Sequence, residues 1–227
     1  RNSILGAGPA GSSRYREARG IGSINFAGYN SSANANQSIV LGGAYNSTSL
    51  LASYSFVHGY RHQALAGNSV LLGGVYNTNS GYRTATLAGL FNTNSGSSTV
   101  MIGGCYSNNA PNSKNSVMVG GVYNNSLSAH SFIAGGYRNC SCNCFGGIIG
   151  GCYNTLNHKE SIIAGSRITS QADCHTFVNN LSASCNIIGK DIQVCNNIAV
   201  NGGVEAGCFQ YNGAGFDTCR SSFTLAL

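Results

Sequence analysis

Apolar residues along this chain fall in short groups of three that recur at a nearly constant interval. Residues 69–77, SVLLGGVYN, give the full unit: a small hydroxyl residue, three apolar residues, a glycine pair, a residue that is usually apolar, an aromatic residue and an asparagine. Counted from the small residue before each triplet, copies begin at positions 23, 38, 54, 69, 84, 99, 116, 131, 146 and 161. A pattern this regular, with intervals of 15 to 17 residues, indicates a repeat architecture.

Each copy is too short for a pair of helices. The triplets, such as IVL at 39–41 and VMV at 117–119, are rich in β-branched residues and end at glycine, whereas the other half of each copy is rich in Asn, Ser and Thr. The pattern therefore predicts a short strand, a turn, a second short strand and a second turn. Stacked in parallel, such coils form an all-β roll or solenoid of about 15 residues per coil, in which neighbouring coils satisfy one another's backbone.

The triplets also predict association between chains. Alternate side chains of a strand point to opposite faces, so the middle residue of each triplet faces away from its two neighbours. A coil this short encloses a single narrow column of side chains, which leaves an apolar stripe larger than monomers tolerate. We therefore predict a homo-oligomer whose shared core or interface contains the middle row. That row comprises Val40, Phe56, Leu71, Met101, Met118, Ile133, Ile148 and Ile163.

Two further columns follow from the same phase. Aromatic residues lie two positions after the second glycine of many copies, at Tyr45, Tyr76, Phe91, Tyr106, Tyr123 and Tyr153. Asparagines follow them, at Asn46, Asn77, Asn92, Asn124 and Asn154. In stacked coils these residues form an aromatic ladder and an asparagine ladder, and a structural role explains the phase of both. A sugar-binding aromatic surface is the alternative.

The repeat divides the chain into four segments. Residues 1–22 hold a partial copy with an inserted loop, and residues 23–175 hold about ten copies of the 15-residue repeat. The pattern fades over 176–189, and residues 190–227 are expected to form an atypical, β-rich terminal module. Terminal modules of repeat arrays are commonly atypical because they cap the stack.

The composition limits the classes of partner that we expect this chain to bind. Only 8% of the residues are charged, the formal net charge is +6, and the basic residues are scattered. The one local basic cluster contains Arg14, Arg16 and Arg19 and lacks a nucleic-acid-binding motif, so we expect no nucleic acid partner. No apolar run reaches the roughly 18 residues that would span a bilayer, so we expect no membrane insertion.

The ten cysteines all lie in the second half of the chain. The cluster CSCNC at 140–144 lacks zinc-finger spacing, and Cys105 and Cys152 take a phase that Val75 and Val122 take in other copies. Cysteine in such a place behaves as a compact hydrophobe. We expect buried free thiols first, with disulfides and then a metal cluster as alternatives, and we assign no metal ligand.

No residues form a recognisable catalytic site. Glycan hydrolysis normally needs two carboxylates about 5 to 9.5 Å apart. Of the six acidic residues, Glu160 and Asp173 fall on adjacent coils, but no histidine or further acid surrounds them. His58 and His62 flank a departure from the repeat, and no nucleophile elbow or phosphate-binding loop is present. We therefore predict a protein that is not an enzyme and has no cofactor.

The repeat resembles the head repeats of YadA-like trimeric autotransporter adhesins and the Gly-Gly-x-x-Asn repeats of tail-fibre and spike proteins of phages and large viruses. The resemblance covers about residues 23–175, and SVMVGGVYN at 116–124 is a representative match. It implies a left-handed parallel β-roll in which three chains pack around one axis, and attachment to a host surface. Adhesin heads usually have fewer aromatic residues and cysteines, which favours a viral fibre.

These observations lead to one functional hypothesis. The chain is expected to be a trimeric tail-fibre or spike segment on a virion surface or otherwise extracellular, binding a host-surface receptor, with carbohydrate the favoured class, by multivalent contacts. A uniform ladder offers little specificity, so the least repetitive regions supply the receptor-binding candidates. These are Arg14, Tyr15, Arg16, Arg19, Phe209, Tyr211 and Phe216. A bacterial adhesin head and a purely structural extracellular filament are the main alternatives, followed by an ice-binding solenoid and a glycan-cleaving spike.

Overall fold

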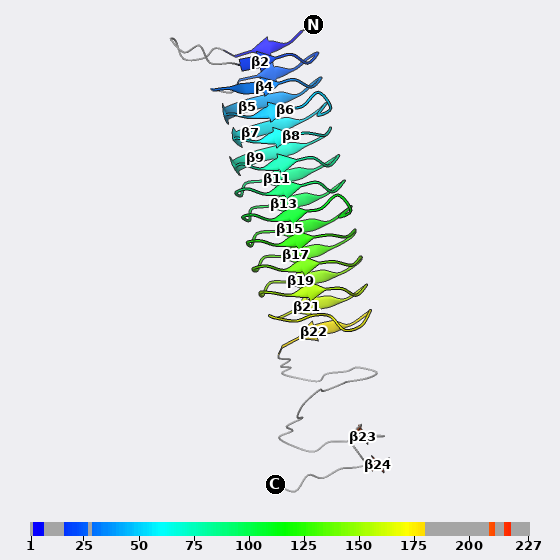
Figure 1. Ribbon diagram of the computed structural model, residues 1–227. Helices are drawn as coiled ribbons and strands as arrows, with labels where there is room; N and C mark the ends of the chain where they lie inside the picture. Colours follow the sequence, from blue (N-terminus) through cyan, green and yellow to red (C-terminus); the bar gives the residue numbers. More distant parts are fainter. Residues whose placement is uncertain (1, 7–15, 27–28, 180–208, 212–215, 219–227) are drawn as a thin grey trace, which may run out of the picture. The chain divides into compact units, whose positions relative to one another are not determined.

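The computed structural model describes residues 2–6, 16–26, 29–179, 209–211 and 216–218. Contacts divide the chain into two compact units, Arg1–Leu181 and Ser182–Leu227. Every regular element among the described residues is a β-strand, and the first unit is a stack of parallel coils (Figure 1). The prediction of an all-β parallel solenoid is therefore confirmed for this unit.

The coils of the first unit form two parallel sheets. The first sheet has 12 strands and carries the apolar triplets. Its strands are β1 (Ile4–Leu5), β3 (Ile24–Asn25), β5 (Ile39–Ala44), β7 (Phe56–Tyr60), β9 (Val70–Val75), β11 (Ala85–Leu87), β13 (Val100–Ile102), β15 (Val117–Val119), β17 (Phe132–Ala134), β19 (Gly147–Ile149), β21 (Ile162–Ala164) and β22 (Thr176–Val178). The solenoid thus continues beyond both ends of the segment 23–175.

The second sheet has 10 strands and carries the polar half of each repeat. Its strands are β2 (Arg16–Ala18), β4 (Ser31–Ala33), β6 (Ser47–Thr48), β8 (Gln63–Ala64), β10 (Thr78–Asn79), β12 (Thr93–Asn94), β14 (Asn108–Asn109), β16 (Asn125–Ser126), β18 (Cys140–Ser141) and β20 (Thr155–Leu156). The first ten coils therefore each contribute one strand to each sheet, as the strand–turn–strand–turn pattern predicts.

Equivalent positions of successive repeats lie above one another. Met101 of β13 pairs with Met118 of β15, which pairs with Ile133 of β17. Backbone hydrogen bonds run from coil to coil, as where the Val70 N–H donates to the Thr84 carbonyl at 2.9 Å. In-register stacking turns every repeat position into a column that runs along the solenoid.

The middle column of the triplets forms the core of the chain's own coils. Leu71, Ile133, Ile148 and Ile163 are 0% exposed. Leu71 packs in a cluster with Ala64 of the second sheet, and Ile148 and Ile163 pack with Leu156. Ile133 packs with Met101 and Met118 of its own column. Because no surface of this column is accessible, it cannot contact a second chain without opening the coil.

That burial corrects the predicted interface. Seven of the eight residues assigned to it lie inside their own chain, with at most 1% exposure: Val40, Leu71, Met101, Met118, Ile133, Ile148 and Ile163. Both faces of the triplet are apolar, so alternation alone did not reveal which face points inward. The exposed stripe is formed instead by the first and third residues of each triplet.

Phe56 was assigned to the wrong column. It pairs with Ile39 and Val70 in the outer column and is half-buried, whereas Val57 pairs with Val40 and Leu71 and is 0% exposed. The strands are irregular here, because register shifts occur between Val40 and Gly42 and again between His58 and Tyr60. A count back from Gly59 therefore places the middle residue of this triplet one position too early, at Phe56 and not at Val57.

Two coils are longer than the others at the same corner. In most coils, the first residue of the second-sheet strand lies six positions before the small residue that precedes the next triplet, as Thr78 lies before Thr84. In the coils that contain Ser47 and Asn108, the same distance is eight positions. In the first long corner Leu50 and Leu51 project, with 77% and 81% exposure. The stack remains in register on both sides, so the corner absorbs the extra residues.

The second unit is described only in part. Strands β23 (Phe209–Tyr211) and β24 (Phe216–Thr218) form an antiparallel pair in which Tyr211 lies opposite Phe216. Antiparallel pairing distinguishes this segment from the solenoid. The remainder of the predicted terminal module 190–227 lies outside the described residues.

Candidate interaction surfaces

The glycine pairs permit a turn that ordinary residues disfavour. Gly73 and Gly74 have φ angles of +67° and +77°, a region in which side chains with a Cβ are strained. A Cβ on Gly74 would also lie 2.2 Å from the Gly89 carbonyl oxygen of the next coil. Conformation and close approach together explain why these glycines keep a fixed phase.

The asparagine ladder lies inside the solenoid and links its coils. The Asn124 Oδ1 accepts the backbone N–H of Asn139 at 3.0 Å, and its Nδ2 donates to the carbonyls of Gly135 and Gly136 at 3.0 and 3.3 Å. Asn124 is 1% exposed. The carboxamide thus bonds to the glycine turn and to a backbone N–H of the next repeat, so each asparagine is a rung between coils.

Sequence reasoning missed Ser31, which accepts the Asn46 N–H at 3.1 Å, and three further members of this column. Asn139 and His62 occupy it as buried rungs, and Ser107 accepts the Asn124 N–H at 3.3 Å. All three lie three residues after the second glycine of their repeat, as Asn124 does. Strict use of the phase would therefore have found them.

The aromatic ladder is continuous along one corner of the solenoid. Successive ring centroids are 4.5 to 6.1 Å apart from Tyr29 to Tyr153. At Tyr60-Arg61 and Tyr137-Arg138 the aromatic residue moves one position earlier and arginine takes its usual place. Arg61 then lies 4.9 to 5.6 Å from the rings of three tyrosines, so a cation packs against three successive rings of the ladder.

This geometry disfavours the ladder as a sugar-binding surface. Phe91 and Tyr106 stack with an interplanar angle of 8°, and Tyr106 and Tyr123 with 10°. Stacking covers the faces of these rings and leaves edges for solvent. Because sugars pack on the faces of aromatic rings, the stacked part of the ladder serves the cohesion of the coils.

The outer face of the first sheet is an exposed apolar surface. Its two columns are the first and third triplet residues, which flank the buried middle column. Leu41, Leu72, Ile102 and Val119 of the third-residue column are 37 to 46% exposed, and Phe132 of the first-residue column is 43% exposed. We call these columns the apolar face. It runs over much of the first sheet, and its residues are aligned from coil to coil, so they form a surface and are not isolated exposed apolar residues.

The outer face of the second sheet is polar. Along it lie the aligned residues Ser47, Gln63, Thr78, Thr93 and Asn108. Some of its groups bond to one another between coils. The Ser80 Oγ donates to the Ser95 Oγ at 2.8 Å. This face offers uncharged hydroxyls and amides in rows.

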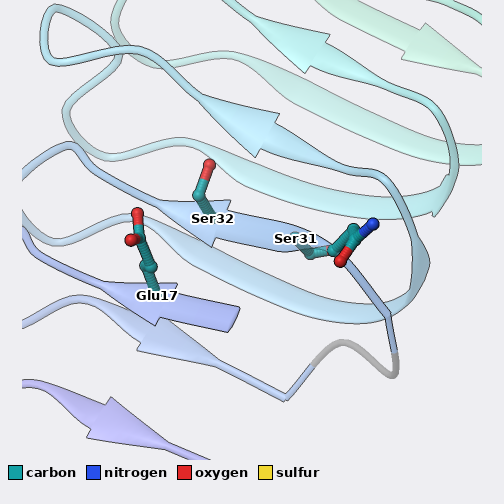
Figure 2. A pocket seen from close by; sticks show the side chains of 4 residues that line it. Glu17, Ser31 and Ser32 are labelled. Atoms are coloured by element: carbon teal, nitrogen blue, oxygen red, sulfur yellow. The ribbon is translucent and has the colours of Figure 1, made fainter. Parts of the chain in front are cut away.

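A shallow depression lies near the N-terminal end of the described solenoid. It has a volume of about 240 Å³ and is lined by Glu17, Asn30, Ser31 and Ser32 (Figure 2). The Glu17 carboxylate accepts a hydrogen bond from the guanidinium of Arg19 at 2.6 Å. The lining therefore combines one carboxylate, which pairs with the nearby Arg19, with hydroxyl and amide groups.

The predicted receptor-binding residues are only partly placed. Arg16 lies on β2, where its guanidinium donates to the Gly6 carbonyl at 2.9 Å, and Arg19 is exposed beside Glu17. Arg14 and Tyr15 lie outside the described residues. The second unit contains the other three candidates, Phe209 and Tyr211 on β23 and Phe216 on β24. In the described part Arg19 contacts Glu17, which was not among the candidates, whereas Arg16 contacts the Gly6 carbonyl.

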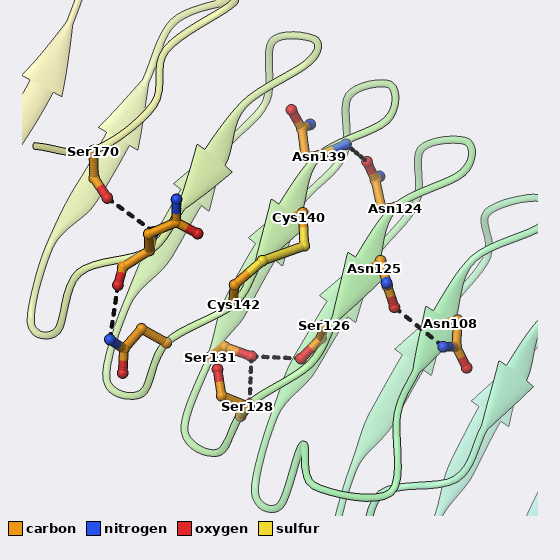
Figure 3. The surroundings of a disulfide bond; sticks show 12 residues. Asn108, Asn124, Asn125, Ser126, Ser128, Ser131, Asn139, Cys140, Cys142 and Ser170 are labelled. Atoms are coloured by element: carbon orange, nitrogen blue, oxygen red, sulfur yellow. Dashed lines mark hydrogen bonds between the residues drawn. A yellow bond between two sulfur atoms is a disulfide. The ribbon is translucent and has the colours of Figure 1, made fainter.

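The cysteines depart from the expected free thiols at one place. Cys140 and Cys142 form a disulfide on the outer face of the second sheet (Figure 3). Cys105, Cys144, Cys152 and Cys174 are free. Cys105 pairs with Leu90 and Val122, as its phase predicts, but it is half-buried rather than buried. The other four cysteines, Cys185, Cys195, Cys208 and Cys219, lie outside the described residues.

Reduction of this disulfide is expected to change the melting temperature of the protein by no more than about 2 °C. The bond spans a single residue, so it removes little freedom from the unfolded chain. Thermal unfolding of the wild type and of Cys140→Ser/Cys142→Ser, with and without reductant, measures the effect. The prediction would be contradicted if reductant lowered the melting temperature of the wild type strongly and the double variant had the same low melting temperature without reductant.

The two acidic residues on adjacent coils form hydrogen bonds with different groups. Glu160 accepts a hydrogen bond from the Cys174 thiol at 3.4 Å, and Asp173 accepts the Lys159 N–H at 2.8 Å. The hydrogen bond to Glu160 raises the pKa of the Cys174 thiol above its ordinary value, and the negative charge of that carboxylate acts in the same direction. Cys174 is thus held as a thiol, which is a weak nucleophile.

Six asparagines begin an Asn-x-Ser/Thr sequence, the acceptor pattern for N-glycosylation, and burial separates those that the structure describes into two kinds. Asn46, Asn124 and Asn139 are rungs with at most 1% exposure, and their amides bond to glycine carbonyls. Asn30 and Asn36 are exposed, and Asn180 lies outside the described residues. A glycan on a rung is incompatible with the closed coil, because the modified nitrogen points into the solenoid.

Comparison with protein-family models and with curated proteins gives no match in either case. No helix among the described residues is long and apolar enough to cross a membrane. Within the same residues, no group of three or more His, Cys, Asp or Glu side chains is placed to hold a metal ion. The fold defines the chain as a β-solenoid. Its candidate functional regions are the apolar face, the polar face of the second sheet and the depression at Glu17.

Proposed function

We propose that the chain is a non-enzymatic attachment protein, a fibre or spike segment that assembles as a homotrimer and binds a host-surface receptor through repeated contacts. The observation that carries the proposal is the apolar face. Its residues repeat along the first sheet over much of the stack, and a partner of matching length covers such a surface best. A second and third copy of the same solenoid have that length and periodicity.

The number of three chains, the left-handed winding and the location on a virion or cell surface rest on the resemblance to YadA-like and viral fibre repeats. The polar face of the second sheet supports carbohydrate as the receptor class, because it presents uncharged hydroxyl and amide groups in rows. Three copies of each contact give avidity to individually weak interactions. The depression at Glu17 is the candidate for a more specific contact, since it lies where the repeat is least regular.

Substitution on the apolar face tests the assembly. The double variant Ile102→Asp/Val119→Asp is expected to weaken association at least about tenfold while leaving the coil folded, because both side chains face outward and charge disfavours an apolar interface. Sedimentation velocity should give three times the chain mass of 23.4 kDa for the wild type and the single chain mass for the variant. Thr93→Asp, on the opposite sheet, is the matched control and should stay trimeric.

A wild-type chain that sediments as a monomer at micromolar concentration would overturn the trimer. The receptor is a separate test, a glycan array probed with the intact assembly. Binding to a defined set of glycans supports a carbohydrate receptor. Absence of glycan binding together with end-to-end association would favour the purely structural filament.

A further inference from the structure

His62 replaces an asparagine in the buried ladder and reproduces its hydrogen bonds. Its backbone N–H donates to the Asn46 Oδ1 at 3.0 Å, its Nδ1 accepts the Asn77 N–H at 3.1 Å, and its Nε2 lies 2.7 Å from the Gly73 carbonyl oxygen. These partners require a neutral imidazole with its proton on Nε2. The side chain is 0% exposed.

The neighbouring rung shows how closely the imidazole substitutes for a carboxamide. The Asn77 Oδ1 accepts the Asn92 N–H at 2.9 Å, and its Nδ2 donates to the carbonyls of Ala88 and Gly89 at 3.2 and 3.1 Å. The imidazole Nδ1 therefore takes the place of the amide oxygen, and Nε2 takes the place of the amide nitrogen. The two side chains differ in one respect: imidazole can be protonated near neutral pH and a carboxamide cannot.

Protonation would remove the acceptor on which the next coil depends. An imidazolium carries N–H donors at both nitrogens, so its Nδ1–H would oppose the Asn77 N–H. A buried backbone N–H would lose its partner, and a buried cation would be created.

Among the described residues, no carboxylate bonds to His62 or contributes to its electrostatics. The sequence contains no acidic residue between Glu17 and Glu160. The charged and titratable groups around the rung are His58 on β7, Arg61 in the aromatic ladder, and the phenols of Tyr45, Tyr60 and Tyr76. Burial lowers the pKa of the His62 imidazole below its ordinary value and His58 lowers it further, against the opposing effect of the bond to Gly73.

We propose that His62 is a proton-sensitive rung, and that its protonation uncouples the coil around residue 62 from the coil that contains Asn77. The asparagine rungs do not titrate, so acid weakens the solenoid locally. The folded-state pKa lies below the unfolded value of about 6.5, so the full stability is present above about pH 6.5 and is lost as the pH falls. For each pH unit below about 6.5, the population of the opened state rises by up to about tenfold.

Amide hydrogen exchange, expressed as protection factors, tests this at the bond itself. Between pH 7.5 and 5.0 the protection of the Asn77 N–H is expected to fall about tenfold or more beyond any change at the Asn92 N–H, which bonds to an asparagine rung. In His62→Asn, which restores the common rung, that difference should vanish. His58→Asn, which alters an exposed histidine, should retain it.

Equal protection of the two amides at both pH values would overturn the proposal, as would a pH effect that persists in His62→Asn. If His62→Asn does not fold, the imidazole is titrated by nuclear magnetic resonance in the wild type. A His62 pKa at or above about 6.5 would then refute the proposal, and a depressed pKa accompanied by loss of protection at Asn77 would support it.

Discussion

Replacing Leu71 with aspartate is expected to prevent the coils around it from closing. Leu71 is 0% exposed and lies between Val57 and Thr86 in the middle column of the first sheet. The variant loses the packing of a buried leucine and buries a carboxyl group without a partner, so we expect a loss of about 5 kcal/mol in the free energy of unfolding. Thermal unfolding followed by circular dichroism measures it.

The adjacent residue is the matched control. Leu72 is 38% exposed on the apolar face, so Leu72→Asp should keep the strand content and melting temperature of the isolated chain and should weaken association instead. The pair separates the core of a single coil from the surface between chains. A folded Leu71→Asp chain with wild-type stability would show that the middle column is not the core.

Replacing Asn124 with alanine is the second change with a large expected effect. The substitution leaves the buried N–H of Asn139 without its acceptor and removes the donor shared by Gly135 and Gly136. We expect a loss of about 3 kcal/mol, because unmade buried hydrogen bonds each cost about 1 to 3 kcal/mol. Chemical denaturation at a fixed protein concentration measures the change.

Asn125→Ala is the control for this rung. Asn125 follows Asn124 directly, but its side chain is half-buried on the outer face and accepts one hydrogen bond, from the Asn108 Nδ2 at 3.1 Å. We expect its effect to stay within about 0.5 kcal/mol. Equal effects of the two substitutions would mean that the inner ladder contributes no more than a surface amide does.

Much of the fold follows from the repeat in the sequence. The spacing of the triplets predicts the strands of the first sheet, and the constant phase of Tyr106 and Asn124 predicts two ladders. The length of the repeat excludes helices. These features depend on local pattern alone, which a single sequence contains.

The assignment of inner and outer faces depends on packing and was harder to predict. The alternation of Val70, Leu71 and Leu72 is the same whichever face points inward. A usable signal is the variation in size: the outer columns hold His58, Phe132 and Gly147, a range that a close-packed core does not tolerate. The middle column lacks such extremes in most coils.

The candidate surfaces were predicted less completely than the fold. Phase alone would have placed His62 in the asparagine column, but its neutral state depends on burial and on the Asn77 N–H, which no sequence pattern displays. The disulfide was left as an alternative because two cysteines on one strand face are equally compatible with free thiols. Glu17 joins the depression only through the contact between β2 and β4, which lies outside the regular repeat.

The long corners bear on how this molecule tolerates change. Leu50 and Leu51 lie where one coil carries two additional residues, and the coil that follows β14 lengthens at the same corner. Strand pairing continues on both sides, so the extra residues of both coils are accommodated at this corner. Foreign peptides grafted at these corners would be displayed at intervals fixed by the coil spacing, which makes the solenoid a ruler for arranging epitopes.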